Sequence, residues 1–281
     1  MPDKIGILHP GEMGISVAVS ARNSGHDIFW VSEGRSQETD KRAQDHLLID
    51  AHSLEELCRT CSVIISICPP HAAQDVARQV IGHSFKGLYA DLNAISPQQA
   101  RGLGDEMEEC GITFVDGGII GGPAWKPGTT WLYLAGREAQ RIANCFSAGP
   151  LQTEIIGAEI GKASALKMCY AAYSKGTAAL LCAVLGASEG LGVRDDLERQ
   201  WSRDESGFAE QATQRVRRVT AKAWRFAGEM DEIAATFREI GMPDGFHNAA
   251  AEMYRRLAGF KGLETLPTLA ETLTVLLDDS R

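Results

Sequence analysis

The fold of this chain is decided near its start, by the stretch Ile5-Gly6-Ile7-Leu8-His9-Pro10-Gly11-Glu12-Met13-Gly14. Lys4–Leu8 has the apolar character of a buried strand, and the turn after it leads into a helix that we predict from Glu12 to about Ser24. A strand, a glycine-containing turn and a helix in this order are typical of a pyrophosphate cradle, because the helix N-terminus offers unpaired N–H groups and a favourable dipole.

The glycines of this turn have different expected tasks. Gly11 would let the backbone approach the phosphates, and Gly14 would let the helix pack closely on the strand. His9 stands where the usual G-x-G-x-x-G pattern has its first glycine, so a strand-turn-helix that binds nothing stays open as the alternative. We assign to the cofactor site the whole turn, His9, Pro10, Gly11, Glu12, Met13 and Gly14.

Strand-like and helix-like segments alternate over the first 157 residues, which predicts an α/β fold with a Rossmann-type, doubly wound parallel sheet. We predict a helix at Gln37–Asp45 and further strands at Asp27–Ser32, Val63–Cys68, Leu88–Leu92, Ile112–Asp116 and Thr130–Leu134. Beyond residue 157 the sequence is Ala-rich and helical in period, with Gly161–Gly190 as one long helix or two joined by a bend. We therefore expect a dinucleotide-binding domain over residues 1–157 and an all-helical domain over residues 158–281.

The composition narrows the function classes. The chain has 281 residues and a formal net charge of −9, which argues against nucleic acid or an anionic membrane as its main partner. Its seven cysteines are scattered and odd in number, which is typical of reduced thiols, and no second pair answers Cys58-x-x-Cys61, so we expect no metal site. The start lacks the pattern of a signal peptide, and we find no apolar run of the roughly 18 residues that span a bilayer. A cytoplasmic protein is expected.

The end of the second predicted strand reads Ser32-Glu33-Gly34-Arg35-Ser36. An acidic residue here usually accepts from the ribose hydroxyls of NAD, whereas arginine accommodates the 2′-phosphate of NADP. Ser32, Arg35 and Ser36 together favour NADP, and Glu33 alone would favour NAD. A solvated polar turn without a ligand is the structural alternative.

Five segments carry a resemblance to a known family: GILHPGEMG (6–14), SEGRS (32–36), DGGIIGGPAWKPGT (116–129), GKASALKMCYAAYSKG (161–176) and WRFAGEMDEIAATFREIG (224–241). The chain resembles the β-hydroxyacid dehydrogenase and 6-phosphogluconate dehydrogenase superfamily, especially a branch of NAD(P) oxidoreductases with its own helical C-terminal domain. The resemblance covers nearly the whole length. It implies hydride transfer between the nicotinamide of NADP and a small hydroxy or keto substrate, and a homodimer formed through the helical domain.

The resemblance also implies site residues. Lys167 matches the catalytic lysine, a general acid/base, and a surface lysine on an Ala-rich helix is the alternative. Lys162 and Lys175 lack that match. The cofactor domain would further contribute Cys68, Pro69, Pro70 and Asn93, and the substrate would meet Ile120, Gly121, Gly122 and, from the second domain, Trp224. Ser96-Pro97, just after Asn93, predicts a helix N-cap.

Two departures from the family pattern bear on the substrate. Tyr170 and Ala171 occupy the family's asparagine positions, and Tyr170 is either a second catalytic residue on the face of Lys167 or a buried aromatic. Ile120 replaces the serine that helps to hold a carboxylate, while Trp125 and Trp131 nearby would line an apolar pocket or simply pack. An imine reductase and a non-catalytic dinucleotide sensor therefore remain alternatives.

In the second domain, Trp224, Arg225, Glu229 and Met230 are predicted to share one helical stripe. For Arg225 and Glu229 we favour a charge ladder on an exposed helix face.

Overall fold

The computed structural model describes residues 2–278 of the chain. It divides into two compact units, Met1–Met168 and Cys169–Arg281. The predicted boundary at residue 157 coincides with the end of the last strand, and the first unit also includes the opening turns of the long helix that follows.

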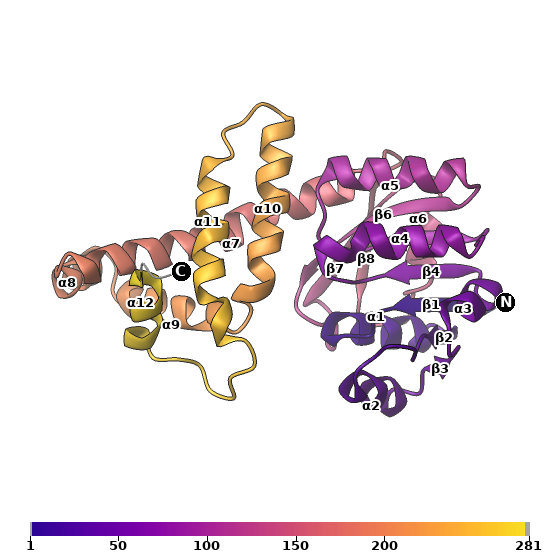
Figure 1. Ribbon diagram of the computed structural model, residues 1–281, viewed down its shortest axis with the longest axis horizontal. Helices are drawn as coiled ribbons and strands as arrows, with labels where there is room; N and C mark the ends of the chain where they lie inside the picture. The colour runs from indigo at the N-terminus through magenta and orange to yellow at the C-terminus, as the bar shows by residue number, and fades with distance from the viewer. Residues whose placement is uncertain (1, 279–281) are drawn as a thin grey trace. The chain divides into compact units, whose positions relative to one another are not determined.

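The first unit is built on one eight-stranded sheet with the order β3-β2-β1-β4-β5-β6-β7-β8 (Figure 1). All neighbouring strands are parallel except β6 and β7, which form an antiparallel hairpin. This arrangement confirms the predicted Rossmann-type sheet. The strands are β1 Lys4–Leu8, β2 Asp27–Trp30, β3 Ile49–Asp50, β4 Val63–Ser66, β5 Leu88–Asp91, β6 Thr113–Gly121, β7 Thr130–Ala135 and β8 Gln152–Gly157.

Two strands differ from the sequence prediction in a way that shapes the site. Strand β8 was not predicted as a separate strand, since its residues Gln152–Gly157 include no buried position and lack an apolar alternation. Strand β6 is longer than predicted: Asp116 pairs with Asp91, the last residue of β5, and β6 then runs on to Gly121. The β6–β7 hairpin therefore projects beyond the end of β5.

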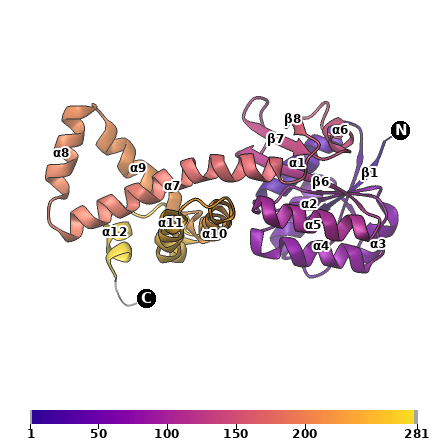
Figure 2. The same ribbon diagram turned by 90° about the horizontal axis from the view of Figure 1, so that it is seen from above.

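Helices cover both faces of the sheet, as Figure 2 shows for α4 and α5 on one side and α6 on the other. One hydrophobic layer includes residues of α1 Glu12–Asn23, α2 Gln37–Asp45 and α6 Ala139–Asn144. The other includes residues of α3 Leu54–Thr60, α4 Ala73–Gly82 and α5 Pro97–Glu109. The N-cap predicted at Ser96 is confirmed, because its hydroxyl accepts from the backbone N–H of Gln99 at 3.4 Å and Pro97 is the first helical residue.

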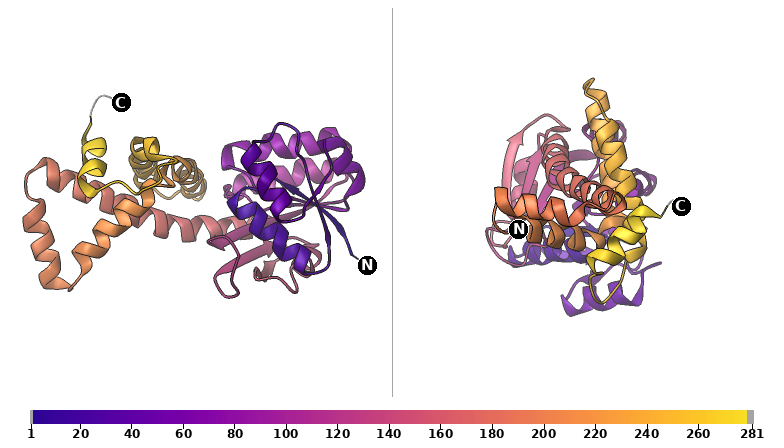
Figure 3. Two further views of the ribbon diagram at one scale, coloured as in Figure 1. Left: turned by 90° about the horizontal axis from the view of Figure 1, so that it is seen from below. Right: turned by 90° about the vertical axis from the view of Figure 1, so that its left-hand side faces the viewer.

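The second unit is entirely helical in the part that the structure describes. Helix α7, Lys162–Gly190, is a single helix of 29 residues that begins in the first unit and continues in the second. The remaining helices are α8 Arg194–Asp204, α9 Phe208–Thr220, α10 Ala223–Glu239, α11 Gly245–Arg256, the 3₁₀ turn η2 Leu257–Phe260 and α12 Leu269–Leu277. Helices α10 and α11 lie side by side as a hairpin (Figures 1 and 3).

Helix α7 corrects one sequence expectation. By length and composition it is apolar enough to cross a membrane, whereas the sequence analysis expects no such segment. Interior helices of soluble proteins meet the same test, and α7 buries Ala178, Cys182 and Leu185.

Candidate functional site

The turn after β1 has the geometry that the sequence predicts for a phosphate cradle. The N–H of Gly11 donates to the carbonyl of His9 at 2.8 Å, and helix α1 follows at once. A Cβ on Gly14 would lie 2.3 Å from the carbonyl oxygen of His9, so no side chain fits there. A Cβ on Gly11 would meet nothing within 4 Å, so this residue faces open space. Both glycines fit their expected tasks.

His9 has φ +73°, a left-handed conformation that glycine adopts easily and other residues rarely do. Its side chain is largely buried. Burial, and then the positive charge of Arg35, lowers the pKa of His9 to about 4, so the imidazole is neutral at pH 7. A partly buried, uncharged histidine therefore stands at the first-glycine position.

Arg35 comes from the loop after β2 and turns inward. Burial lowers the pKa of its guanidinium, and its Nε is buried without a hydrogen-bond partner. Ser32 shapes the turn, since its carbonyl accepts from the N–H of Arg35 at 3.1 Å. Ser36 is the N-cap of α2, and its hydroxyl accepts from the N–H of Thr39 at 3.3 Å. The structure thus brings Arg35 to the cofactor turn and gives Ser36 a structural hydrogen bond.

Asn93 joins the ends of β4 and β5. Its side-chain oxygen accepts from the N–H of Cys68, and its amide nitrogen donates to Asp91 at 2.8 Å and to Ser66 at 3.1 Å. Asp91 is fully buried, which raises the pKa of its carboxyl to about 7. Pro69 and Pro70 follow Cys68 and open the 3₁₀ turn η1 Pro70–Ala72. The predicted residues Cys68 and Asn93 are therefore in direct contact.

Asp116 was not predicted as a site residue, although it begins the quoted DGG segment. Its buried carboxylate accepts from the backbone N–H groups of Gly161 and Ala163, both at 2.9 Å, and of Ser164 at 3.2 Å. The Ser164 hydroxyl donates to it at 2.6 Å. These bonds lower the pKa of Asp116, but burial outweighs them and the pKa lies above its ordinary value. Asp116 thus ties β6 to the start of α7.

Lys167 lies on α7 where this helix passes close over β6. A Cβ on Gly118 would lie 2.7 Å from the carbonyl oxygen of Ala163 and 3.0 Å from the Cβ of Lys167, so only glycine allows the close approach. The Lys167 ammonium donates to the carbonyl of Ile119, and the side chain is partly buried. Lys167 is therefore held on β6, unlike a lysine that extends from a helix surface into solvent.

The β6–β7 hairpin carries the predicted substrate loop. Ile120 pairs with Trp131 across the hairpin, so their side chains share one face. Gly121 has φ +126°, and a Cβ there would lie 2.5 Å from the carbonyl oxygen of Thr129. Gly122 has open space around it.

The tip of the hairpin is anchored to the cofactor helix. The N–H of Ala124 donates to the Ser16 hydroxyl at 2.9 Å, and that hydroxyl donates to the carbonyl of Met13 at 2.8 Å. Trp125 stacks on His46, with ring centroids 5.4 Å apart. The candidate substrate loop and the turn of α1 thus share hydrogen bonds.

The comparisons with known proteins agree with this geometry. Residues 4–147 match the family described as the NAD binding domain of 6-phosphogluconate dehydrogenase. The chain belongs to this family. Residues 189–257 match a second family, described as a domain of unknown function. The superfamily that the sequence resembles is confirmed.

Two similar proteins cover most of the chain. An uncharacterized 28.5 kDa protein of Methanothermus fervidus is 32% identical over 194 residues, which are 69% of this chain and 74% of that protein. A conserved protein of unknown function, described as structurally similar to 3-hydroxyacid dehydrogenases, has a TM-score of 0.67 and 29% identity over 92% of this chain and 97% of its own.

Two more distant structures share the fold. A 3-hydroxyisobutyrate dehydrogenase of Mycobacterium tuberculosis, with L-serine, has a TM-score of 0.72 and 16% identity, covering 99% of this chain and 100% of its own. An imine reductase variant of Myxococcus stipitatus, in complex with NAD⁺, has a TM-score of 0.57 and 18% identity, covering 99% of this chain and 100% of its own. The fold is therefore that of hydroxyacid dehydrogenases, and imine reductases share it.

The turn residues fit the cofactor of this NAD-binding family. Gly14 provides the close helix–strand packing, Gly11 leaves open space, and Arg35 offers an unpartnered buried donor beside the turn. Within residues 2–278 we find no group of three or more His, Cys, Asp or Glu side chains placed to hold a metal ion.

Two predicted site residues, Tyr170 and Trp224, belong to the second unit. Tyr170 is 50% exposed on α7, so its alternative as a buried aromatic is wrong. Trp224, at the start of α10, lies under the ammonium of Lys261, 4.0 Å from the ring centroid.

Glu229 corrects the exposed charge ladder that we favoured. It is 5% exposed, and its carboxylate pairs with the Lys175 ammonium at 2.8 Å as well as with Arg225 at 3.5 Å. The predicted i, i+4 pair exists, but its acid is buried.

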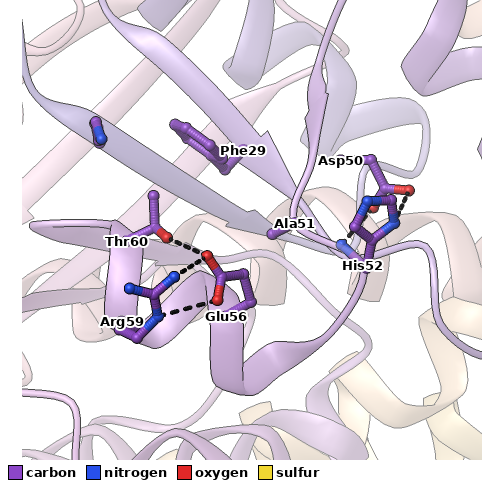
Figure 4. Close-up of a pocket in the computed structure, with 8 residues that line it drawn as sticks. Phe29, Asp50, Ala51, His52, Glu56, Arg59 and Thr60 are labelled. Carbon is purple, nitrogen blue, oxygen red and sulfur yellow. Dashed lines mark hydrogen bonds and ion pairs between the residues drawn. The ribbon is translucent and has the colours of Figure 1, made fainter.

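A pocket of about 560 Å³ lies beside β1, β2 and α3 and contains none of the predicted site residues (Figure 4). Several of its polar side chains pair with one another: Arg59 and Thr60 donate to Glu56, and His52 lies 3.1 Å from Asp50. We assign no role to this pocket.

Proposed function

We propose that this protein is an NADP-dependent oxidoreductase that transfers a hydride between the nicotinamide and a small hydroxy or keto substrate. The observation that carries the proposal is the placement of Lys167. Gly118 of β6 allows the backbone of α7 to come close at Lys167, and the carbonyl of Ile119 accepts a hydrogen bond from the Lys167 ammonium. Asp116 fixes the start of α7 one turn before Lys167. A lysine held in this way suits a general acid/base better than a solvated surface position does.

Lys167 is proposed to donate a proton to the substrate oxygen when a carbonyl is reduced, and to accept it in the reverse direction. The nicotinamide, when bound, supplies or accepts the hydride. Tyr170 is proposed to assist in orienting the substrate, since it lies one turn beyond Lys167 and is exposed. Trp224 is proposed as a substrate contact from the helical domain.

The substrate is proposed to bind beside the hairpin residues Ile120, Gly121 and Gly122. Ile120 and Trp131 share one face, and both side chains are partly exposed. The aliphatic Ile120 offers no donor for a carboxylate where the family has serine. A substrate with an apolar group at this position fits the hairpin better than a compact, highly charged acid does.

Arg35 supports NADP over NAD, because its unpartnered Nε lies beside the cofactor turn. We further propose a dinucleotide-binding domain over residues 1–157, a substrate and dimerisation domain over residues 158–281, a cytoplasmic location and a homodimer without nucleic acid or membrane partners.

Imine reduction is the second candidate. Ile120 in place of serine favours a substrate without a carboxylate, and an imine reductase shares the fold. The lysine at position 167, which contacts β6 and matches the catalytic lysine of hydroxyacid dehydrogenases, counts against imine reduction. A sensor that binds the dinucleotide without turnover is a third candidate, and it would need no reactive lysine.

The test compares Lys167→Ala with Lys162→Ala, a control on the same helix whose ammonium lies 3.6 Å from Glu159. We expect Lys167→Ala to lower kcat about 10²- to 10⁴-fold while the Kd for NADPH stays unchanged, because the lysine acts on the substrate proton. Lys162→Ala should leave both values unchanged. Turnover is followed by NADPH absorbance with panels of hydroxyacids, aldehydes and imines.

The same panel separates the candidates. If imines alone are reduced, the imine reductase is correct. If NADPH binds and no compound in the panel changes its absorbance, the sensor is correct and the enzyme proposal fails.

A further inference from the structure

The segment of residues 67–70, which follows β4, has few backbone groups that can hold it in place. Its last two residues are prolines without an N–H, so its first two residues supply its only backbone donors. The first N–H donates to the carbonyl of Leu8, the last residue of β1, at 3.2 Å. The second, that of Cys68, donates to the side-chain oxygen of Asn93. One side chain from the end of another strand therefore holds half of these donors.

The segment 67–70 lies at the point of the sheet where a dinucleotide would cross. The strand order runs from β1 through β2 to β3 in one direction and from β4 through β5 to β6 in the other, and β1 pairs with β4. Dinucleotides bind at the carboxyl ends of the strands where the strand order reverses in this way. The cofactor turn follows β1 and the segment 67–70 follows β4, so the two flank the point of reversal.

Asn93 is bonded within the protein through both polar atoms of its side chain. Its oxygen accepts from the N–H of Cys68, and its nitrogen uses both hydrogens, one toward Asp91 at 2.8 Å and one toward Ser66 at 3.1 Å. The side chain is buried and has no donor left for a ligand. An asparagine bonded in this way acts on a cofactor through the segment that it holds.

Asp91 sets the orientation of the Asn93 side chain. Its two oxygens accept from the backbone N–H of Asn93 at 3.0 Å and from the side-chain nitrogen of Asn93 at 2.8 Å. The two ends of an amide have nearly the same shape, so the hydrogen-bond partners decide which end faces which neighbour. Because the nitrogen faces Asp91, the oxygen is turned toward the N–H of Cys68. Asp91 is 1% exposed, so its route to the cofactor site runs through Asn93.

We propose that Asp91 is a positioning residue of the cofactor site: by orienting Asn93, it fixes the segment 67–70 at the strand ends where the dinucleotide binds. This inference rests on the proposed function, which supplies the dinucleotide. Both backbone N–H groups of the segment are bonded within the protein, so the segment offers carbonyls and side chains to the cofactor and no backbone donor to a phosphate. Its placement should therefore affect NADPH and NADH alike.

The test uses Asp91→Asn, which keeps the size of the side chain and replaces one acceptor oxygen by an NH₂ group. We expect the Kd for NADPH and the Kd for NADH each to rise about three- to tenfold, the effect of roughly one hydrogen bond. The kcat at saturating NADPH should change less than about twofold, because Lys167 is held separately on β6. Titration of cofactor fluorescence gives both Kd values, and thermal unfolding shows that the variant is folded.

A double-mutant cycle tests whether Asp91 acts through Asn93. Asn93→Ala removes the acceptor of the Cys68 N–H and should raise both Kd values at least as much as Asp91→Asn does. In the Asn93→Ala background, Asp91→Asn should change neither Kd by more than about twofold, because the residue through which Asp91 acts is already gone. Effects of the two substitutions that simply multiply would overturn the inference.

Ser66→Ala and Ser62→Ala are a matched pair at opposite ends of β4. The Ser66 hydroxyl accepts from the Asn93 side chain at 3.1 Å, whereas the Ser62 hydroxyl donates to Asp3 at 2.8 Å. Ser66→Ala should raise both Kd values about two- to threefold, because Asn93 loses one of its acceptors. Ser62→Ala should leave both unchanged, which separates loss of the Asn93 contact from a general effect of removing a hydroxyl beside β4.

Other outcomes overturn the inference in distinct ways. If Asp91→Asn lowers the melting temperature and leaves both Kd values unchanged, Asp91 serves folding stability alone, and the proposed oxidoreductase still stands. If the variant weakens NADPH and not NADH, Asp91 acts on the 2′-phosphate and not on the segment 67–70. If the unmodified protein binds neither cofactor, the proposed function itself has failed.

Discussion

The two units bury acidic side chains in different ways. In the first unit, Asp116 is held by three backbone N–H groups and one hydroxyl at the start of α7. In the second unit, Glu229 is held by the ammonium of Lys175, which also lies 5.1 Å from the ring centroid of Phe226. One carboxylate is stabilised by peptide dipoles and the other by an opposite charge.

The difference teaches what each buried acid can do. Peptide N–H groups fix the position of a helix end, so Asp116 sets where α7 begins and hence where Lys167 lies on β6. The ion pair of Lys175 and Glu229 joins α7 to α10 and does not position a site residue. It therefore contributes to the stability of the helical unit. The first arrangement positions a site, and the second closes a core.

The largest expected effect is the loss of folding stability when the Lys175–Glu229 ion pair is broken. Glu229→Gln should lower the free energy of unfolding by about 4 kcal/mol, because it leaves the Lys175 charge buried without its partner. Urea denaturation measures it. The control Arg225→Ala removes the longer, more exposed contact to Glu229 and should cost less than about 1 kcal/mol. Equal losses of unfolding free energy for the two variants would show that the contact of Glu229 with Lys175 stabilises the protein no more than its contact with Arg225.

Asp116→Ala comes next, with an expected loss of about 3 kcal/mol, since three backbone N–H groups and one hydroxyl lose their acceptor. Turnover should also fall at least about tenfold, because Lys167 loses its fixed helix start. Ser164→Ala, which removes one of the four donors, is the milder comparison at about 1 kcal/mol. Asp116→Ala with full activity would contradict a positioning role.

Asp91 gives a prediction about pH. Burial raises its pKa from 3.8 to about 7, so between these values the folded state holds a proton that the unfolded state has lost. The stability from this proton is fully present below pH 3.8 and is lost as the pH rises through about 7. Relative to Asp91→Asn, the wild type should therefore lose about 2 kcal/mol between pH 5 and pH 8. Parallel stability curves for the two proteins would contradict the raised pKa.

The smallest effect concerns the anchor of the hairpin tip. Ser16→Ala should cost about 1 kcal/mol, because the N–H of Ala124 loses its acceptor. Ser20→Ala, on the same helix, should cost less, since the buried Ser20 hydroxyl has no hydrogen-bond partner. Thermal unfolding of the two variants distinguishes them, and a larger loss for Ser20→Ala would exclude the Ala124 bond as the tighter constraint.

Local patterns predicted much of the first unit. The strand at Lys4–Leu8, the helix at Gln37–Asp45 and the cap at Ser96 follow from apolar runs, breakers and capping residues close together in the chain. Strand β3 has two residues and strand β8 has no buried residue, so neither has a strong pattern of its own. They exist because a neighbouring strand pairs with them.

The residues that sequence reasoning missed depend on long-range contacts. Lys175 and Glu229 come from different helices, and nothing near Glu229 in the chain distinguishes it from an exposed acid. Asp116 meets its partners more than forty positions later, at the start of α7. The neutral state of His9 likewise depends first on its burial in the folded chain and then on Arg35 from the next strand end. Burial and charge at these positions follow from the folded topology.

The projecting β6–β7 hairpin has a mechanical consequence. Strand β6 continues five residues past its pairing with β5, which corresponds to roughly 16 Å at the usual rise of a strand. A hairpin held only at its base would have a tip that is free to move. Here the Ala124–Ser16 bond and the Trp125–His46 stack support the far end as well. The hairpin is therefore supported at both ends, and Ile120 and Trp131 pair on the span between the two supports.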